Sequence, residues 1–275
     1  MADRQIPKLT EQKFVRILTD ELGLTRGSVV FIHSSVDGLN LDFPFSRIIP
    51  IIREIIGENG TALFPTTQFL ERAEEYIRKG EIFDVRRSPS KMGLISEDAR
   101  RQKDAFRSRH PTNSVAAIGR LARELTENHI RSIYPCGEDS PYHMIIKHGG
   151  IIVGLGVSTV NLSFVHCVED DIKDRFPVET RTQTVFECPV RDYEGREFKV
   201  RTLVAHRRIR MRNIERYVRR YIPGDVCRDM NINGIRFFRA DAAKLFKTME
   251  ELALKGITIY SRFVYRKSPF SRFIR

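Results

Sequence analysis

Three short apolar runs constrain the fold of this 275-residue chain more than any other feature of its sequence. They cover residues 28–33, 60–65 and 150–156, and each ends in small or polar residues. Continuous apolar runs of this length are typical of strands that are buried on both faces of a parallel sheet. The pattern therefore predicts an α/β protein.

Helical patterns lie between and after these runs. An apolar stripe beginning after a suitable capping residue, Thr10, predicts a helix over residues 10–22, and a second helix is predicted over residues 45–56. The order strand, helix, strand favours a parallel pair joined by a crossover. Helices are also expected over residues 115–125 and 142–147.

The pattern of apolar and charged residues changes at two places along the chain. Residues 68–109 are irregular and highly charged, which indicates a long loop that carries short helices. Beyond residue 170, alternating runs at 182–186 and 197–204 predict antiparallel strands. We therefore expect an α/β portion over residues 1–170 and an α+β portion over residues 171–275, packed together as one compact unit.

Charge limits the classes of partner. The chain carries 47 Lys and Arg against 35 Asp and Glu, a formal charge of +12 at pH 7. Such a field attracts anions and repels cations. We expect a negatively charged partner: a nucleotide-bearing cofactor or substrate, nucleic acid, or an anionic membrane face.

The expected location is the cytosol. No apolar run approaches the roughly 20 residues that span a bilayer, and the N-terminus lacks the apolar core of a signal peptide. The cysteines are widely spaced without a C-x-x-C pair, which predicts reduced thiols and neither a zinc site nor a disulfide framework. They are Cys136, Cys167, Cys188 and Cys227.

One pair of side chains has the spacing of a proton-handling dyad. His166 and Glu169 are three residues apart, so a helix or turn places them on one face. A carboxylate at that position orients an imidazole and stabilises its protonated form. The spacing alone is common, but the pair follows the third apolar run, where α/β proteins place their ligands. A metal site would need a third ligand, and the sequence shows none, so no metal is expected.

Two more polar segments have the composition of ligand-binding loops. A strand-to-loop turn explains the first equally well, and a capped helix entry explains the second equally well. Glycines at positions 154 and 156 resemble part of a dinucleotide fingerprint, but tight packing explains them better. The two segments contain His33, Ser34 and Ser35, and Ser108, His110 and Ser114.

Taken in order, seven segments of the chain resemble the aminoglycoside 3-N-acetyltransferase family, acetyl-CoA-dependent enzymes unrelated in fold to the GNAT acetyltransferases. The resemblance covers roughly residues 28–170. The segments read VFIHSS (30–35), GTALFPT (60–66), SPSKMG (88–93), RSRHP (107–111), GEDSP (137–141), VGLGV (153–157) and HCVE (166–169).

The resemblance implies an α/β/α sandwich with a central mixed sheet, in which residues 1–170 bind CoA and carry the catalytic groups. It implies that His166 and Glu169 are the catalytic pair and that acetyl-CoA, or another short acyl-CoA, is the co-substrate. It also implies that the two polar segments contact the cofactor or form pocket walls. The family's usual Asn-Thr before the histidine is altered here to NLSFVH (161–166), which puts acceptor contacts of this loop in doubt.

The implied reaction is direct transfer in a ternary complex. His166 takes a proton from the acceptor amine while the nitrogen of that amine attacks the thioester carbon. Backbone N–H groups or a hydroxyl stabilise the oxyanion that develops on the thioester oxygen. Much of the rate then comes from positioning. Cys167 is expected to serve packing, with acyl-enzyme chemistry as the lesser alternative.

The positive charge favours one acceptor class over another. Aminoglycosides are polycations, which a basic enzyme repels, whereas a nucleotide-linked amino sugar carries an anionic diphosphate. We therefore expect a nucleotide-linked amino sugar of the kind used in polysaccharide biosynthesis. The alternative is an aminoglycoside 3-N-acetyltransferase that confers antibiotic resistance.

Basic residues concentrate towards the C-terminus. These residues would be explained by a solvated helix face together with a terminal arm that packs on the body of the protein or on a second subunit of a homo-oligomer. The more specific hypothesis is a surface that binds anionic lipid headgroups. The alternative from another functional class is a basic protein that binds nucleic acid or a membrane surface without catalysis. The sequence shows no nucleic-acid-binding module, so no nucleic acid is expected as partner. The residues are Arg207, Arg208, Arg210, Arg212, Arg216, Arg219 and Arg220, and then Arg262, Arg266, Lys267, Arg272 and Arg275.

Overall fold

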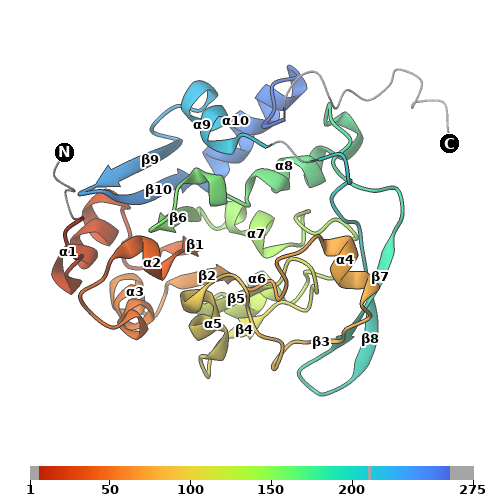
Figure 1. The fold of residues 1–275 in the computed structure, drawn as a ribbon, viewed down its shortest axis with the longest axis horizontal. Helices are drawn as coiled ribbons and strands as arrows, with labels where there is room; N and C mark the ends of the chain where they lie inside the picture. The colour runs from red at the N-terminus through yellow and green to blue at the C-terminus, as the bar shows by residue number, and fades with distance from the viewer. Residues whose placement is uncertain (1–5, 210–211, 261–275) are drawn as a thin grey trace.

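The three predicted strands form the centre of a seven-stranded sheet (Figure 1). A computed structural model describes residues 6–209 and 212–260. Strand β1 (Val29–Ser34) lies between β2 (Thr61–Pro65) and β6 (Ile151–Leu155) and is parallel to both. The expected parallel pair with a crossover is confirmed.

Antiparallel strands extend this sheet on both sides. On one side β5 (Val115–Gly119) pairs with β2, and β4 (Phe106–Arg107) pairs with β5. On the other, β10 (Ile235–Asp241) pairs with β6, and β9 (Cys227–Ile232) pairs with β10. The expected mixed sheet is confirmed, with the order β4-β5-β2-β1-β6-β10-β9. Since β9 and β10 come from beyond residue 170, that part of the chain shares the sheet; the division at residue 170 stays a prediction.

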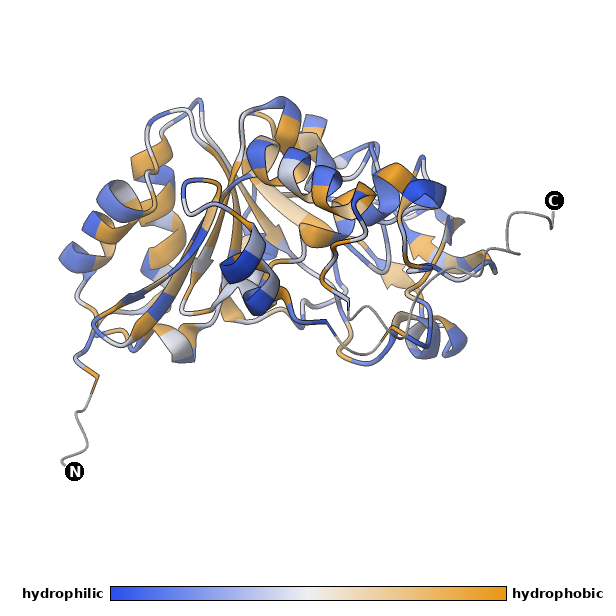
Figure 2. Cartoon of the chain, turned by 90° about the horizontal axis from the view of Figure 1, so that it is seen from above, coloured by the Kyte–Doolittle hydropathy of each residue, from blue (hydrophilic) through white to orange (hydrophobic). Residues whose placement is uncertain are grey.

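Helices cover both faces of the sheet, as the alternation of side chains along a strand requires. In β1, Val29 and Phe31 enter one hydrophobic cluster, whereas Val30 and Ile32 enter the other. Figure 2 shows the apolar residues gathered between the sheet and the helices. The α/β/α sandwich is confirmed. One layer holds α1 (Glu11–Arg16), α2 (Val36–Leu39), α3 (Ile48–Ile56) and α5 (Leu94–Arg101), and the other holds α6 (Ala122–Thr126), α7 (Pro141–Lys147), α8 (Val165–Ile172), α9 (Ile214–Tyr221) and α10 (Ala242–Leu254).

The predicted helices before β1 and β2 are confirmed. Thr10 caps α1, because its hydroxyl accepts a hydrogen bond from the backbone N–H of Lys13 at 3.2 Å. A π-helical turn (Ile17–Glu21) continues this helix, and a 3-10 turn (Phe45–Arg47) precedes α3. Further 3-10 turns lie at Thr159–Asn161 and Lys173–Arg175.

The helix expected over residues 115–125 is wrong in its first half, where β5 lies instead. This strand is buried on both faces: Val115 and Ala117 enter one cluster and Ile118 the other. A short apolar run of this kind does not distinguish a buried strand from a buried helix. Gly119 ends the strand at φ +116°, where a Cβ atom would lie 2.2 Å from the carbonyl oxygen of Gly60.

A small three-stranded sheet lies beside the main one. Its strands are β3 (Phe83–Asp84), β7 (Phe186–Arg191) and β8 (Glu197–Thr202), and β7 and β8 are antiparallel. The strand predicted over residues 182–186 is wrong, because β7 begins only at residue 186. The strand predicted over 197–204 is confirmed as β8. The long loop over residues 68–109 is confirmed and carries α4 (Ala73–Arg78) and α5.

Other sequence-based expectations can be followed in the same structure. All four cysteines are free and buried, and Gly154 faces Phe238 so closely that a Cβ atom would meet its ring at 2.1 Å, which confirms a packing role. In the described part of the chain, no helix has the length and apolarity to cross a bilayer. Arg210 and the basic residues from 262 onwards lie outside the described residues.

Candidate active site

The predicted dyad lies on one helix. His166 and Glu169 occupy the first turns of α8, which follows β6 through a short loop. Nδ1 of His166 lies 3.0 Å from Oε2 of Glu169, and the two side chains are 16% and 2% exposed. The carboxylate is thus buried beneath an imidazole whose other edge is accessible.

A tyrosine holds the second oxygen of Glu169. The hydroxyl of Tyr260 donates a hydrogen bond of 2.7 Å to Oε1, so both carboxylate oxygens have fixed partners. Burial alone would raise the pKa of Glu169, but the charge and hydrogen bond of His166, the Arg181 guanidinium and the Tyr260 hydroxyl together hold that pKa below its usual value. Glu169 is therefore ionised at neutral pH.

An arginine faces the other edge of the imidazole. Nη1 of Arg212 lies 3.1 Å from Nε2 of His166. A guanidinium only donates hydrogen bonds, so Nε2 is the acceptor and the ring proton is on Nδ1, where it binds Glu169. We assign this tautomer from the hydrogen-bond network. It is the one that a general base requires, because the lone pair of Nε2 points outwards.

An ion pair beneath α8 fixes the helix. Arg181 binds both oxygens of the fully buried Asp170, at 2.6 Å from Nε and 2.7 Å from Nη2. Asp170 also accepts a hydrogen bond from the backbone N–H of Cys136 at 2.8 Å. Because these contacts involve the residue next to Glu169, they determine where the carboxylate of the dyad lies.

The segment His33 to Ser35 lies at the end of β1, where the side chain of His33 faces the layer that holds the dyad and Ser35 leads into α2 in the opposite layer. Nε2 of His33 is 3.4 Å from the hydroxyl of Ser163, three residues before His166. Ser35 caps α2 by accepting a hydrogen bond from Gly38 at 3.2 Å. The Ser34 hydroxyl is buried and has no hydrogen-bond partner among the described residues.

The loop from Ser108 to Ser114 is almost entirely buried. The Ser108 hydroxyl accepts a hydrogen bond from the backbone of Val115 and contacts Nδ1 of His129 at 2.8 Å. The Ser114 hydroxyl donates to the carbonyl of Thr66. No helix begins here, so the capped helix entry proposed for His110 is wrong, because strand β5 follows the loop. These hydroxyls hold the loop in place, and cofactor binding by Ser108, His110 and Ser114 stays a prediction.

Three buried histidines predict an acid-sensitive fold. Burial lowers the pKa of His33 and His129 to about 4, and it lowers that of His110 well below its usual value. In the unfolded chain the three histidines take up protons near pH 6.5, whereas in the folded chain they stay neutral. The free energy of unfolding is therefore highest above that pH and falls as the pH is lowered towards 4.

We therefore expect the free energy of unfolding to fall by up to about 4 kcal/mol per pH unit between pH 6 and pH 5, about 1.4 for each histidine. Urea denaturation at several pH values measures it. An unfolding free energy that stays constant between pH 7 and pH 5 would show that these rings take up protons in the folded state.

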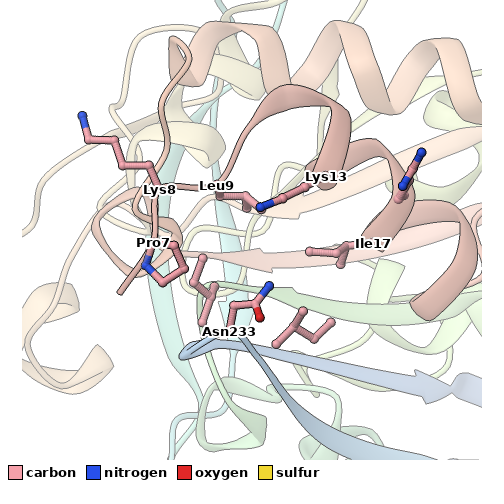
Figure 3. Close-up of a pocket in the computed structure, with 9 residues that line it drawn as sticks. Pro7, Lys8, Leu9, Lys13, Ile17 and Asn233 are labelled. Atoms are coloured by element: carbon pink, nitrogen blue, oxygen red, sulfur yellow. The ribbon is translucent and has the colours of Figure 1, made fainter. Parts of the chain in front are cut away.

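Two of the hollows in the described surface lie beside the N-terminal segment of the chain, and Lys8 lines both. One of about 740 Å³ is bordered by the cations Lys8 and Arg236; the rest of its lining is Ile6, Asp37, Gly38, Asn40, Gly156 and Gly234. The other, of about 180 Å³, is mainly apolar and lies between α1 and the turn from β9 to β10 (Figure 3). Its labelled walls include Leu9, Ile17 and Asn233. The first hollow includes Asp37 and Gly38 of α2, the helix that Ser35 caps.

Sequence reasoning missed four residues of the site: Tyr260, Arg212, Asp170 and Arg181. The sequence indicates Arg212 only as one member of a basic cluster, and no motif points to Tyr260. A single antiparallel β-bridge joins Arg212 to Tyr260 and brings both to the dyad. Nothing local in the sequence indicates a bridge between residues so far apart.

Comparison with known proteins shows which family this chain resembles in sequence. The family model described as Aminoglycoside 3-N-acetyltransferase matches residues 31–253. Aminoglycoside N(3)-acetyltransferase III of Serratia marcescens is 28% identical over 188 residues, which are 64% of this chain and 68% of that protein. Aminoglycoside N(3)-acetyltransferase VII of Streptomyces paromomycinus is 31% identical over 176 residues, 58% of this chain and 60% of the relative.

A solved structure agrees in fold. AAC-IIIb in a binary complex with CoASH superposes with a TM-score of 0.73 at 21% identity, covering 93% of this chain and 100% of that one. Fold and family match together define the class of acyl-CoA-dependent N-acyltransferases. Within that class, the chain belongs to the aminoglycoside 3-N-acetyltransferase family.

Proposed function

We propose that this chain transfers an acetyl group from acetyl-CoA to the amine of an amino sugar, with His166 as general base and Glu169 as the carboxylate that orients it. The observation that carries the proposal is the network around the imidazole: Nδ1 at 3.0 Å from the carboxylate and Nε2 acting as an acceptor. This is the arrangement of a base whose outer nitrogen carries the lone pair that can accept a proton.

The proton follows a simple route. The acceptor nitrogen gives a proton to Nε2 of His166 as its lone pair forms a bond to the thioester carbon, and Glu169 compensates the imidazolium charge. The carbon–sulfur bond then breaks, the amide forms, and the proton leaves on the CoA sulfur as a free thiol. Burial raises the pKa of the Cys167 thiol well above its usual value, which supports a packing role and direct transfer.

The cofactor is proposed to lie beside the end of β1. Among the described residues the buried Ser34 hydroxyl has no hydrogen-bond partner, and a hollow that includes Gly38 of the next helix, α2, is bordered by Lys8, Arg236 and Asp37. Cations at such a place suit the phosphates of CoA. In this arrangement His33 holds Ser163 and thereby the loop before His166, while the buried loop from Ser108 to Ser114 supports the wall of the site.

Two acceptor classes have support of different kinds. Both relatives named above are aminoglycoside N(3)-acetyltransferases, which favours an aminoglycoside and a role in antibiotic resistance. The nucleotide-linked amino sugar that the charge of the chain predicts has no counterpart among them. It remains the second candidate, because the formal charge is +12 and Arg212 stands directly at the nitrogen that receives the proton.

An acceptor panel tests the proposal. With acetyl-CoA present, we expect thiol release and an N-acetylated product with an aminoglycoside or with a nucleotide-linked amino sugar, and background release without an amine. Thiol titration and mass spectrometry measure both. Absence of turnover with every amine, together with salt-sensitive binding to DNA or RNA, would instead favour the non-catalytic rival.

A further inference from the structure

We propose that Arg212 selects the acceptor, favouring an amine that has an anionic group close by over a polycation. The inference deepens the proposed function and rests on His166 as the base. It gives one exposed arginine of the basic segment a specific role in the reaction, namely control of access to the catalytic nitrogen.

The position of the guanidinium carries the inference. Nη1 of Arg212 donates to Nε2 of His166 at 3.1 Å. A substrate amine must come within about 3 Å of the same nitrogen to give up its proton. Arginine and acceptor therefore compete for one lone pair, and the guanidinium must turn aside before the reaction begins.

The backbone keeps Arg212 at the site while its side chain turns. Arg212 forms the β-bridge with Tyr260, and the next residue, Asn213, donates its N–H to the carbonyl of Ile259 at 3.0 Å. Asn213 also caps α9 by accepting a hydrogen bond from the backbone of Arg216. The guanidinium is exposed, and among the described residues no carboxylate forms an ion pair with it. Its charge therefore remains near any bound acceptor.

That charge treats the two acceptor classes differently. A carboxylate or phosphate on the acceptor would bind the planar guanidinium through two parallel hydrogen bonds and draw it off Nε2. Binding and exposure of the base would then occur together. A polyamine offers no such partner and places further positive charges beside Arg212, which repels it.

Replacing Arg212 by alanine tests the inference. The two acceptors are a uridine-diphosphate-linked amino sugar and an aminoglycoside, each assayed with acetyl-CoA by thiol release. For Arg212→Ala we expect kcat/KM to fall about tenfold with the nucleotide-linked sugar, through KM, and to rise about tenfold with the aminoglycoside. The KM for acetyl-CoA should stay unchanged, and Arg212→Lys should restore part of the preference.

Arg219→Ala is the matched control, since it removes the same charge from an exposed position of α9. Equal ratios of kcat/KM for the two acceptors in wild type and Arg212→Ala would overturn the inference, as would the same shift in Arg219→Ala. Calorimetric measurement of the binding of both acceptors in the presence of CoA distinguishes a failure of this inference from a failure of the proposed function. Absence of turnover in the wild type refutes the acyltransferase, whereas acceptor affinities that do not depend on Arg212 refute the selection.

Discussion

Glu169→Gln is expected to lower kcat on the order of 10³-fold, within the range of a lost general base, and to leave acetyl-CoA binding intact. The reason is the tautomer of His166. The Tyr260 hydroxyl donates to one oxygen of Glu169, so a glutamine there turns its carbonyl towards the tyrosine and its NH₂ towards Nδ1. That NH₂ donates to Nδ1, the ring proton moves to Nε2, and no lone pair faces the acceptor.

A second substitution provides the control. In Glu169→Gln with Tyr260→Phe, the glutamine is free to turn its carbonyl oxygen to Nδ1 and restore the correct tautomer. We expect recovery of about tenfold, the equivalent of one hydrogen bond. Thiol release under saturating substrates measures kcat for both variants. Wild-type turnover in Glu169→Gln would show that the carboxylate does not set the protonation of the imidazole.

The central layer of the fold could be predicted because burial leaves a direct trace in sequence. Strands β1, β2 and β6 are covered on both faces by helices, so each is a continuous apolar run between turn residues. The same rule explains the failure at residues 115–119. There the run is equally apolar, and only pairing with β2 determines that it is a strand.

The site could be predicted only where its parts are local. His166 and Glu169 are neighbours on one helical turn, so their spacing was informative. Tyr260 and Arg212 reach the dyad through long-range pairing, and neither lies in a motif. For the loop from Ser108 to Ser114, the sequence shows its polar composition but not its burial, because its partners, Thr66 and His129, are remote in the chain.

His166→Ala is expected to lower kcat at least as much as Glu169→Gln does, because it removes the base itself. Proton transfer by a positioned side chain contributes about 10² to 10⁴ in rate, and we expect kcat to fall about 10³-fold. The imidazole is 16% exposed, so its removal opens a path by which water can reach the buried Glu169 carboxylate, and the variant should fold. His148→Ala is the matched control. It removes a histidine at the C-cap of α7, whose Nε2 lies 3.1 Å from Glu124 on α6.

Thiol release from acetyl-CoA by wild type, His166→Ala and His148→Ala, with CoA affinity measured calorimetrically for each, tests the proton-transfer claim most directly. We predict that turnover and N-acetylated product fall about 10³-fold only in His166→Ala, while all three proteins bind CoA alike. Turnover by His166→Ala at the wild-type rate would contradict the account.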